Sequence, residues 1–222
     1  MKNENKSIKK EKKCYSVKII IVGDASVGKT NIIYRFVNGQ FMTDYEITLG
    51  VDFLSYNLEF DDKIFKLLLM DTAGSEKFRS ITRGYYKNTS FALIVYDITD
   101  KNSFNSVRQW IEDCQNYSNA NIHIVLVGNK VDLTKGRKVD IEEGKELAEE
   151  FGMDFFETSA KTGENIEKVF LKICELLSNN IDEGKYDFNN PSTGINISEV
   201  DEVFQIDKSV MSEKRRPEKK CC

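Results

Sequence analysis

The chain has 222 residues, of which 40% are hydrophobic, so it is long enough to bury one sizeable core. Its formal net charge of −4 hides an asymmetry, because residues 1–13 hold six Lys against two Glu and residues 213–222 hold five Lys or Arg against two Glu. A nucleic-acid-binding protein would show a basic body, so an acidic body with basic ends argues against that class. The basic ends suit an anionic surface, although a solvated flexible tail explains residues 1–13 equally well.

Two further functional classes find no support in the composition. No run approaches the ~18 apolar residues of a membrane-spanning helix. Cys14, Cys114 and Cys174 stand singly, which suits a reducing compartment rather than a disulfide framework or a metal site. His123 falls within an apolar run, and we interpret it as structural.

From residue 15 to residue 178 the pattern alternates between strand and helix. Short, nearly continuous apolar runs predict strands that are buried on both faces, at 17–22, 64–70, 91–97, 122–127 and 154–157. Residues 51–60 alternate between apolar and polar side chains and predict an edge or antiparallel strand. Helical patterns lie between the strands, at 28–38, 76–87, 103–118, 140–151 and 163–178. We therefore expect an α/β fold with a doubly wound, mostly parallel six-stranded sheet and helices on both faces.

The pattern predicts three parts: a flexible basic extension over residues 1–14, one domain over 15–178, and a flexible tail over 179–222. The tail is rich in Asn, Asp and Ser and shows little periodicity. Its one apolar cluster, at 200–206, is explained equally well as a docking motif or as a loosely packed segment.

The segment Gly23-Asp-Ala-Ser-Val-Gly-Lys-Thr30 has the spacing of a phosphate-binding loop between a strand and a helix. Its glycines let backbone N–H groups turn around phosphate oxygens, and the helix adds its positive N-terminal end. Lys29 would reach the β- and γ-phosphates, and the Thr30 hydroxyl would bind Mg²⁺. A turn without a ligand would need neither side chain. The other residues expected to contact the nucleotide here are Asp24, Ala25, Ser26, Val27 and Gly28.

The base is predicted from a second loop, Gly128-Asn-Lys-Val-Asp132, which follows the run at 122–127. The Asp132 carboxylate fits guanine, whose N1–H and exocyclic amine are adjacent donors, whereas the adenine N1 would present a lone pair. Leaving buried polar groups unpaired in this way gives discrimination on the order of 10⁴–10⁵. An Asx-rich turn explains Asp132 alone, but not its combination with the polar cluster Thr158-Ser-Ala-Lys161. We therefore expect Asn129, Lys130 and Asp132 to bind guanine.

Two further segments are predicted to act as switches. Asp71 ends the run at 64–70 and would hold a Mg²⁺-bound water, while Gly74 would let a backbone N–H approach the γ-phosphate. Thr48 lies in a polar loop and could bring its hydroxyl to Mg²⁺, although an ordinary loop hydroxyl is an equally good interpretation. Loops that are held only by metal and γ-phosphate are released after hydrolysis.

Over roughly residues 15–178 the sequence resembles the Ras-like small GTPases, and within them the Rab branch. The segments that carry the resemblance are Leu49-Gly-Val-Asp-Phe53, Lys66-Leu-Leu-Leu-Met-Asp-Thr-Ala-Gly74, Phe78-Arg-Ser-Ile-Thr82 and Ile94-Val-Tyr-Asp-Ile-Thr99. The resemblance implies a GTP/GDP switch with Mg²⁺ as cofactor. It also implies that Phe41 packs on guanine, that Tyr45 covers the phosphates, and that the base is supported by Ser159, Ala160 and Lys161.

Two residues depart from the pattern of these relatives. Ser75 stands where most of them carry a glutamine that orients the attacking water, so we expect slow intrinsic hydrolysis. The resemblance places Lys29, Thr48 and Gly74 with Ser75 in the catalytic set. Met70 replaces a tryptophan in an aromatic surface triad completed by Phe53 and Tyr85, which predicts an altered effector surface.

The resemblance also implies a membrane cycle, with the protein on the cytoplasmic face of intracellular membranes and returning to the cytosol. Cys221 and Cys222 match the doubly geranylgeranylated ending of a Rab, with two unmodified thiols as the less favoured alternative. The implied partners are an exchange factor, a GTPase-activating protein, effectors, GDP dissociation inhibitor and Rab escort protein. Two functions stay open: a cycling GTPase in vesicle traffic, or a GTP-bound scaffold that hydrolyses negligibly. A phosphate-loop ATPase is a distant third, because of Asp132.

Overall fold

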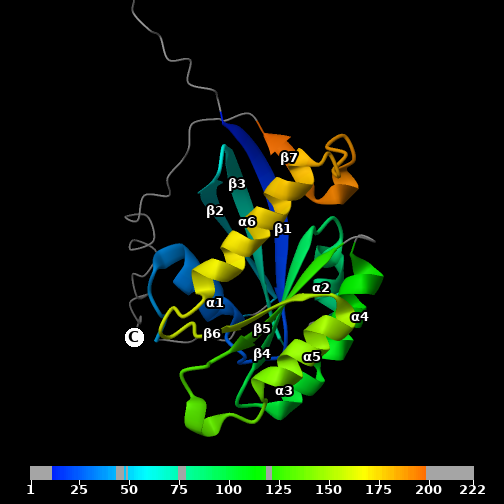
Figure 1. Ribbon diagram of the computed structural model, residues 1–222. Coiled ribbons are helices and arrows are strands. Elements are labelled where there is room, and N and C mark those ends of the chain that lie inside the picture. Colours follow the sequence, from blue (N-terminus) through cyan, green and yellow to red (C-terminus); the bar gives the residue numbers. More distant parts are fainter. Residues whose placement is uncertain (1–11, 44–47, 49, 75–78, 119–121, 199–222) are drawn as a thin grey trace, which may run out of the picture.

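The computed structural model describes residues 12–43, 48, 50–74, 79–118 and 122–198. Within this part of the chain the strands form one sheet in the order β2-β3-β1-β4-β5-β6, with helices on both faces (Figure 1). The strands of this path are β1 (Lys13–Val22), β2 (Val51–Phe60), β3 (Lys63–Thr72), β4 (Phe91–Asp97), β5 (His123–Asn129) and β6 (Asp154–Thr158). The helices are α1 (Lys29–Asn38), α2 (Arg79–Tyr86), α3 (Lys101–Asn105), α4 (Val107–Tyr117), α5 (Ile141–Phe151) and α6 (Ile166–Asp182).

The apolar runs form strands because both faces of the sheet are covered. Along β1, Ile19 and Ile21 belong to a core cluster that includes side chains of α1 and α6. Ile20 and Val22 point the other way and belong to a second cluster that includes side chains of α4 and α5. All neighbours along the path pair in parallel except β2 and β3, which are antiparallel. The predicted fold class is therefore confirmed, including the antiparallel edge strand at 51–60.

The C-terminal part of the described chain differs from the expected flexible tail. Helix α6 continues to Asp182, and β7 (Ile195–Ser198) adds a seventh strand that pairs antiparallel with β1 (Figure 1). Ile195 is completely buried in the core. The Lys18 N–H donates to the carbonyl of Gly194, which has a φ of 71°. Residues 179–198 thus belong to the domain, and a four-residue strand with only two apolar side chains was too short to predict.

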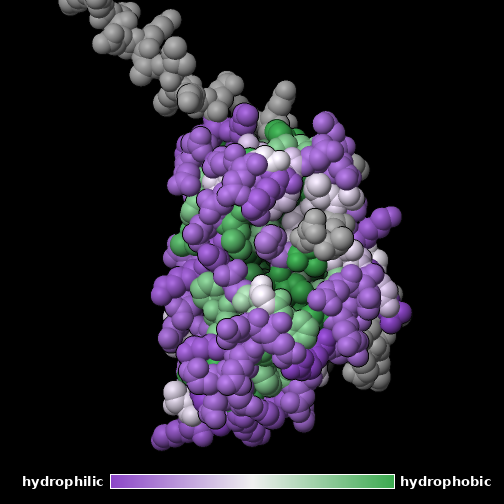
Figure 2. Space-filling view, turned by 45° about the vertical axis from the view of Figure 1, so that its right-hand side comes forward, coloured by the Kyte–Doolittle hydropathy of each residue, from purple (hydrophilic) through white to green (hydrophobic). Residues whose placement is uncertain are grey.

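Smaller differences occur at other boundaries. Strand β1 begins at Lys13, inside the expected extension, because it pairs with both β3 and β7 there. The single helix expected at 103–118 is two helices, α3 and α4, which meet at Ser106. Polar side chains cover most of the face in Figure 2, and apolar side chains gather in a hollow at its centre. None of the described helices is both long and apolar enough to cross a bilayer.

Candidate functional site

The loops after β1, β3, β5 and β6 meet at the carboxyl ends of these strands. The Thr30 hydroxyl, in the first turn of α1, donates to Asp71 at the end of β3. The Asn129 amide at the end of β5 donates to the carbonyl of Val27, in the loop after β1. These contacts bring together segments that lie 41 and 102 residues apart in the sequence. A ligand that bound at this edge would contact all of them.

The loop after β1 has a backbone that only glycine allows at two positions. Gly23 has a φ of 139°, and a Cβ there would lie 2.1 Å from the carbonyl oxygen of Val95. Gly28 has a φ of 100°, and its Cβ would lie 2.4 Å from the amide nitrogen of Asn129. Helix α1 begins directly after Gly28, so the loop ends at a positive helix terminus. This is the geometry of an anion-binding loop.

Lys29 is the only lysine of this loop and is 5% exposed. Its ammonium donates to the carbonyl oxygens of Gly23 at 2.9 Å and Asp24 at 2.8 Å. Burial lowers the pKa of Lys29 to about 8, and the negative charges of Asp71 and Asp24 oppose this shift. A buried ammonium with neutral partners favours an added anion, which is the role predicted for Lys29.

Two hydroxyls and one carboxylate form the candidate metal site. The Thr30 hydroxyl lies 2.5 Å from Asp71 Oδ2 and 3.0 Å from the Thr48 hydroxyl, which is 3.5 Å from the same oxygen. Asp71 Oδ1 is buried without a hydrogen-bond partner among the described residues. Burial raises the pKa of Asp71, and the Thr30 hydrogen bond and the Lys29 charge oppose the rise.

These three residues fit Mg²⁺ better than any metal that needs a full protein cage. Mg²⁺ takes one or two carboxylates, keeps several waters and binds substrate phosphates. Across the described ranges there is no group of three or more His, Cys, Asp or Glu suited to a metal. Thr30, Thr48 and Asp71 would hold the ion together with phosphate oxygens, and a cation there would neutralise the unpartnered Asp71 oxygen.

Asn129, which is expected to bind guanine, also makes contacts within the protein. Its side chain is 1% exposed and joins three segments. Its amide nitrogen donates to Val27 at 2.9 Å, and its oxygen accepts from the Thr158 hydroxyl and the Ala160 N–H, each at 3.2 Å. Asn129 therefore fastens the phosphate-binding loop to the loops after β5 and β6.

Lys130 lies beside Asn129 and also crosses to the phosphate-binding loop. Its ammonium donates to the carbonyl of Ser26 at 2.8 Å and pairs with Asp97 Oδ2 at 2.6 Å. Lys130 and Ser26 both have positive φ, of 73° and 63°. The sequence prediction missed Asp97, although this residue ends β4 and lies within one of the segments that resemble the Rab branch.

The residues expected around the base lie together after β5 and β6. Asp132 Oδ1 accepts from the Ser159 hydroxyl at 2.6 Å, which orients the carboxylate. Ala160 is buried and Lys161 is exposed. Arg35 of α1 donates to the main-chain oxygens of both Ala160 and Lys161. Arg35 was also missed, because nothing local in the sequence relates it to a loop more than a hundred residues away.

Other predicted site residues divide into placed and undescribed ones. Phe41 is 36% exposed, so its ring is available to a ligand. A Cβ on Gly74 would lie 2.3 Å from the main-chain carbon of Asp24, so this position tolerates only glycine. Tyr45 and Ser75, like Cys221 and Cys222, lie outside the described residues. Of the remaining loop residues, Ala25 is exposed and Val27 is buried.

A model of the Ras family matches residues 18–179, a range that contains every loop described above. The chain belongs to the Ras family. It is accordingly a small GTPase by family and a GTP-binding switch, and Ras-family proteins bind GTP and GDP, typically with Mg²⁺. They generally interact with exchange factors, activating proteins and effectors. The phosphate-binding loop and the loops holding Asp132 and Ala160 are the parts of the fold that would receive the nucleotide.

One member of the expected effector surface of this Ras-family chain is not on the surface. Phe53 is 62% exposed, and its ring centroid lies 5.6 Å from that of Tyr85. Met70 pairs with Phe53 across β2 and β3 but is only 1% exposed, because it belongs to the second core cluster, with Ile20 and Tyr86. The expectation that Met70 alters an exposed triad is therefore wrong, and the accessible pair is Phe53 and Tyr85.

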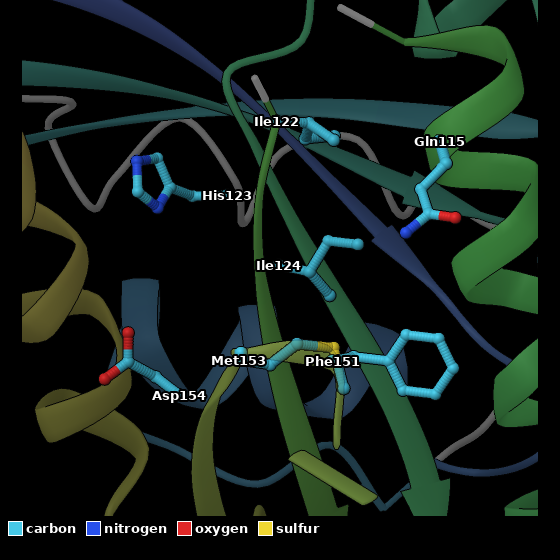
Figure 3. Close-up of a pocket in the computed structure, with 8 residues that line it drawn as sticks. Gln115, Ile122, His123, Ile124, Phe151, Met153 and Asp154 are labelled. Atoms are coloured by element: carbon cyan, nitrogen blue, oxygen red, sulfur yellow. The ribbon is translucent and has the colours of Figure 1, made fainter. Parts of the chain in front are cut away.

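A separate shallow pocket of about 190 Å³ lies at the N-terminal ends of β5 and β6, away from the candidate nucleotide site (Figure 3). Ile122, His123 and Ile124 line it, with Phe151 and Asp154. Burial lowers the pKa of His123, and the charge of Asp154 opposes this shift. Most of the lining residues lie at or next to the N-terminal ends of β5 and β6, so this pocket is remote from the phosphate-binding loop.

Proposed function

We propose that the protein is a Rab-like small GTPase, a GTP/GDP switch in vesicle trafficking that recruits effectors when it is bound to GTP. The observation that carries the switch is the meeting of Thr30, Thr48 and Asp71 at one carboxylate oxygen. Thr48 lies before β2 in the sequence, whereas Asp71 lies near the end of β3. Such a loop would be held by metal and γ-phosphate and released after hydrolysis.

The Rab branch is supported by the sequence segments given above and by one surface feature. Phe53 and Tyr85 place two aromatic rings in contact next to the second candidate switch, and Phe53 is mostly exposed. Exposed aromatic side chains of this kind are typical anchors in protein interfaces. The proposed effector would therefore bind across β2 and the C-terminal end of α2.

Hydrolysis is proposed to be slow because Ser75 replaces the water-orienting glutamine. A serine hydroxyl is about two bonds shorter than that amide, and the loss of one positioning donor costs on the order of 10²–10³ in rate. Single-turnover hydrolysis should therefore be faster in Ser75→Gln than in the wild type. Ser75→Ala is the matched control, since it removes the hydroxyl without adding an amide. Equal rates in the wild type and Ser75→Gln would refute the proposal.

The second candidate function is a GTP-bound scaffold that recruits effectors constitutively, and Ser75 is the observation that favours it. An activating protein that supplies both an arginine and a glutamine would still switch the protein off. Chromatography of the nucleotide released from protein purified from cells separates the two functions. A cycling switch should carry a large share of GDP, whereas a scaffold should carry almost only GTP.

Membrane attachment is proposed through geranylgeranyl groups on Cys221 and Cys222, next to the basic residues 214–220. Two lipid chains give stable anchoring where one gives marginal binding, and the basic residues add attraction to anionic lipid. The protein would then cycle between the cytoplasmic face of intracellular membranes and the cytosol, with Rab escort protein and GDP dissociation inhibitor as carriers. Replacing both cysteines with serine should leave GDP binding unchanged and move the protein to the soluble fraction. Unchanged membrane association would contradict this.

A further inference from the structure

Trp110 is the one tryptophan of the chain and contacts the phosphate-binding loop from outside it. It lies in the middle of α4 and is 2% exposed. Its indole N–H donates to Asp24 Oδ1 at 2.8 Å. Hydrogen bonds from a neutral donor to a carboxylate are stronger than bonds between neutral groups, and more so where water is excluded.

Within the described part of the chain Asp24 is held at several points, and Trp110 donates a hydrogen bond to its side chain. Its main-chain oxygen accepts from the Lys29 ammonium at 2.8 Å. Its main-chain carbonyl carbon would lie only 2.3 Å from a Cβ added to Gly74, so the two main chains are in close contact. A shift of Asp24 would therefore move the phosphate-binding lysine, the start of the second candidate switch and the peptide N–H groups that follow Asp24.

Helix α4 is a rigid support for this contact. Val107, Ile111 and Cys114 are completely buried on the face that also carries Trp110. One end of the same helix contacts α2, because the Arg83 guanidinium lies 4.8 Å from the ring centroid of Tyr117. Trp110 and Tyr117 are seven residues apart, which is about two turns along one helix face. The phosphate-binding loop and α2 thus rest on the same helix.

We propose that Trp110 is a positioning residue for the phosphate-binding loop, acting through the carboxylate of Asp24. The proposal rests on the GTP binding of the proposed function and adds to it a residue outside the nucleotide-binding loops. The indole N–H fixes Asp24, and Asp24 in turn fixes the main chain that surrounds the phosphates. Loss of this donor leaves the base-binding residues in place but weakens the binding of the phosphates by the loop.

The test is the rate at which GDP dissociates from the full-length protein, measured with a fluorescent GDP analogue and excess unlabelled GDP. Trp110→Phe keeps an aromatic ring in the core but removes the donor and part of the buried volume, and it should raise the rate by about tenfold. Ile111→Val is the matched control, since it also removes buried volume from α4 but no hydrogen bond. Its rate should stay within about twofold of the wild type.

A double-mutant cycle separates positioning from packing. Asp24→Ala should also speed dissociation, and the double variant of Trp110→Phe with Asp24→Ala should be no faster than the faster single variant. Multiplying effects would show that Trp110 acts by packing alone and would overturn the proposal. So would a rate for Trp110→Phe equal to that of Ile111→Val.

Fluorescence provides a readout that does not require replacing Trp110. In Asp24→Ala the indole N–H loses its carboxylate partner, so the emission maximum of Trp110 should shift to shorter wavelength, while Ile111→Val should leave it unchanged. An unshifted spectrum would overturn the contact itself. A wild-type protein that retained no GDP at all would contradict GTP binding instead, and the emission of Asp24→Ala would still report on the contact.

Discussion

Replacing Asn129 with alanine should destabilise the domain as well as weaken nucleotide binding. In the structure this side chain forms hydrogen bonds with three other residues of the protein, Val27, Thr158 and Ala160. It is 1% exposed, so water does not reach these groups while the fold is intact. Alanine would remove all three bonds at once.

The size of the effect follows from the groups that are left behind. The Val27 carbonyl and the Ala160 N–H would each lose a partner, at about 1–3 kcal/mol for a buried group, whereas the Thr158 hydroxyl can rotate. Part of this cost returns if water enters the vacated space. We expect the free energy of unfolding to fall by about 3 kcal/mol, which shifts a urea midpoint by about 1.5 M at a typical slope of about 2 kcal/mol per M.

The assay is urea unfolding of the nucleotide-free protein, so that lost ligand binding does not contribute. Thr158→Val is the matched control, because it keeps the shape and removes one of the three hydrogen bonds, and it should cost about 1 kcal/mol. If Asn129→Ala unfolded within about 0.5 kcal/mol of the wild type, the role as a fastener between loops would be refuted. Faster GDP dissociation with unchanged stability would place Asn129 on the base alone.

Three further outcomes are expected. Between about pH 8 and the ordinary lysine pKa of 10.5, the free energy of unfolding of the nucleotide-free wild type, taken relative to Lys29→Met, should rise by up to about 1.4 kcal/mol per pH unit. The reason is that the folded protein loses the Lys29 proton at a lower pH than the unfolded chain. Paired urea titrations measure this difference, and a difference independent of pH would contradict the prediction. Deleting residues 185–222 should lower the free energy of unfolding by at least about 2 kcal/mol, since β7 and its buried isoleucine are lost. Deleting 199–222 keeps β7 and should not lower it. Equal urea midpoints for the two truncations would show that β7 contributes nothing. Gly74→Ala should speed GDP dissociation, because its Cβ would clash with the main chain of Asp24. A rate equal to that of the wild type would show that Asp24 can shift without weakening nucleotide binding.

Much of the sheet was predictable, because strands that are covered on both faces need continuous apolar runs. Strand β4 is the clearest example, with all seven residues buried as its sequence predicted. Strand β7 was not predictable, since its four residues gain their stability from pairing with β1, more than 170 positions earlier. The break between α3 and α4 at Ser106 was missed because no proline or glycine marks it in the sequence.

The site shows the same division between local and long-range information. The loop around Lys29 and the carboxylate of Asp132 could be predicted because each belongs to a short contiguous motif. Asp97, Arg35 and Trp110 were missed, because each acts on a loop through a contact that bridges a long stretch of sequence. Such contacts follow from the fold and not from spacing.

Calorimetry of the nucleotide-stripped protein with Mg²⁺ tests the central claim most directly. GDP should bind tightly, and ADP should bind at least about 10⁴-fold more weakly, because the Asp132 carboxylate is proposed to pair with the two adjacent donors that guanine has and adenine lacks. Comparable binding of ADP, or no binding of GDP, would contradict the account.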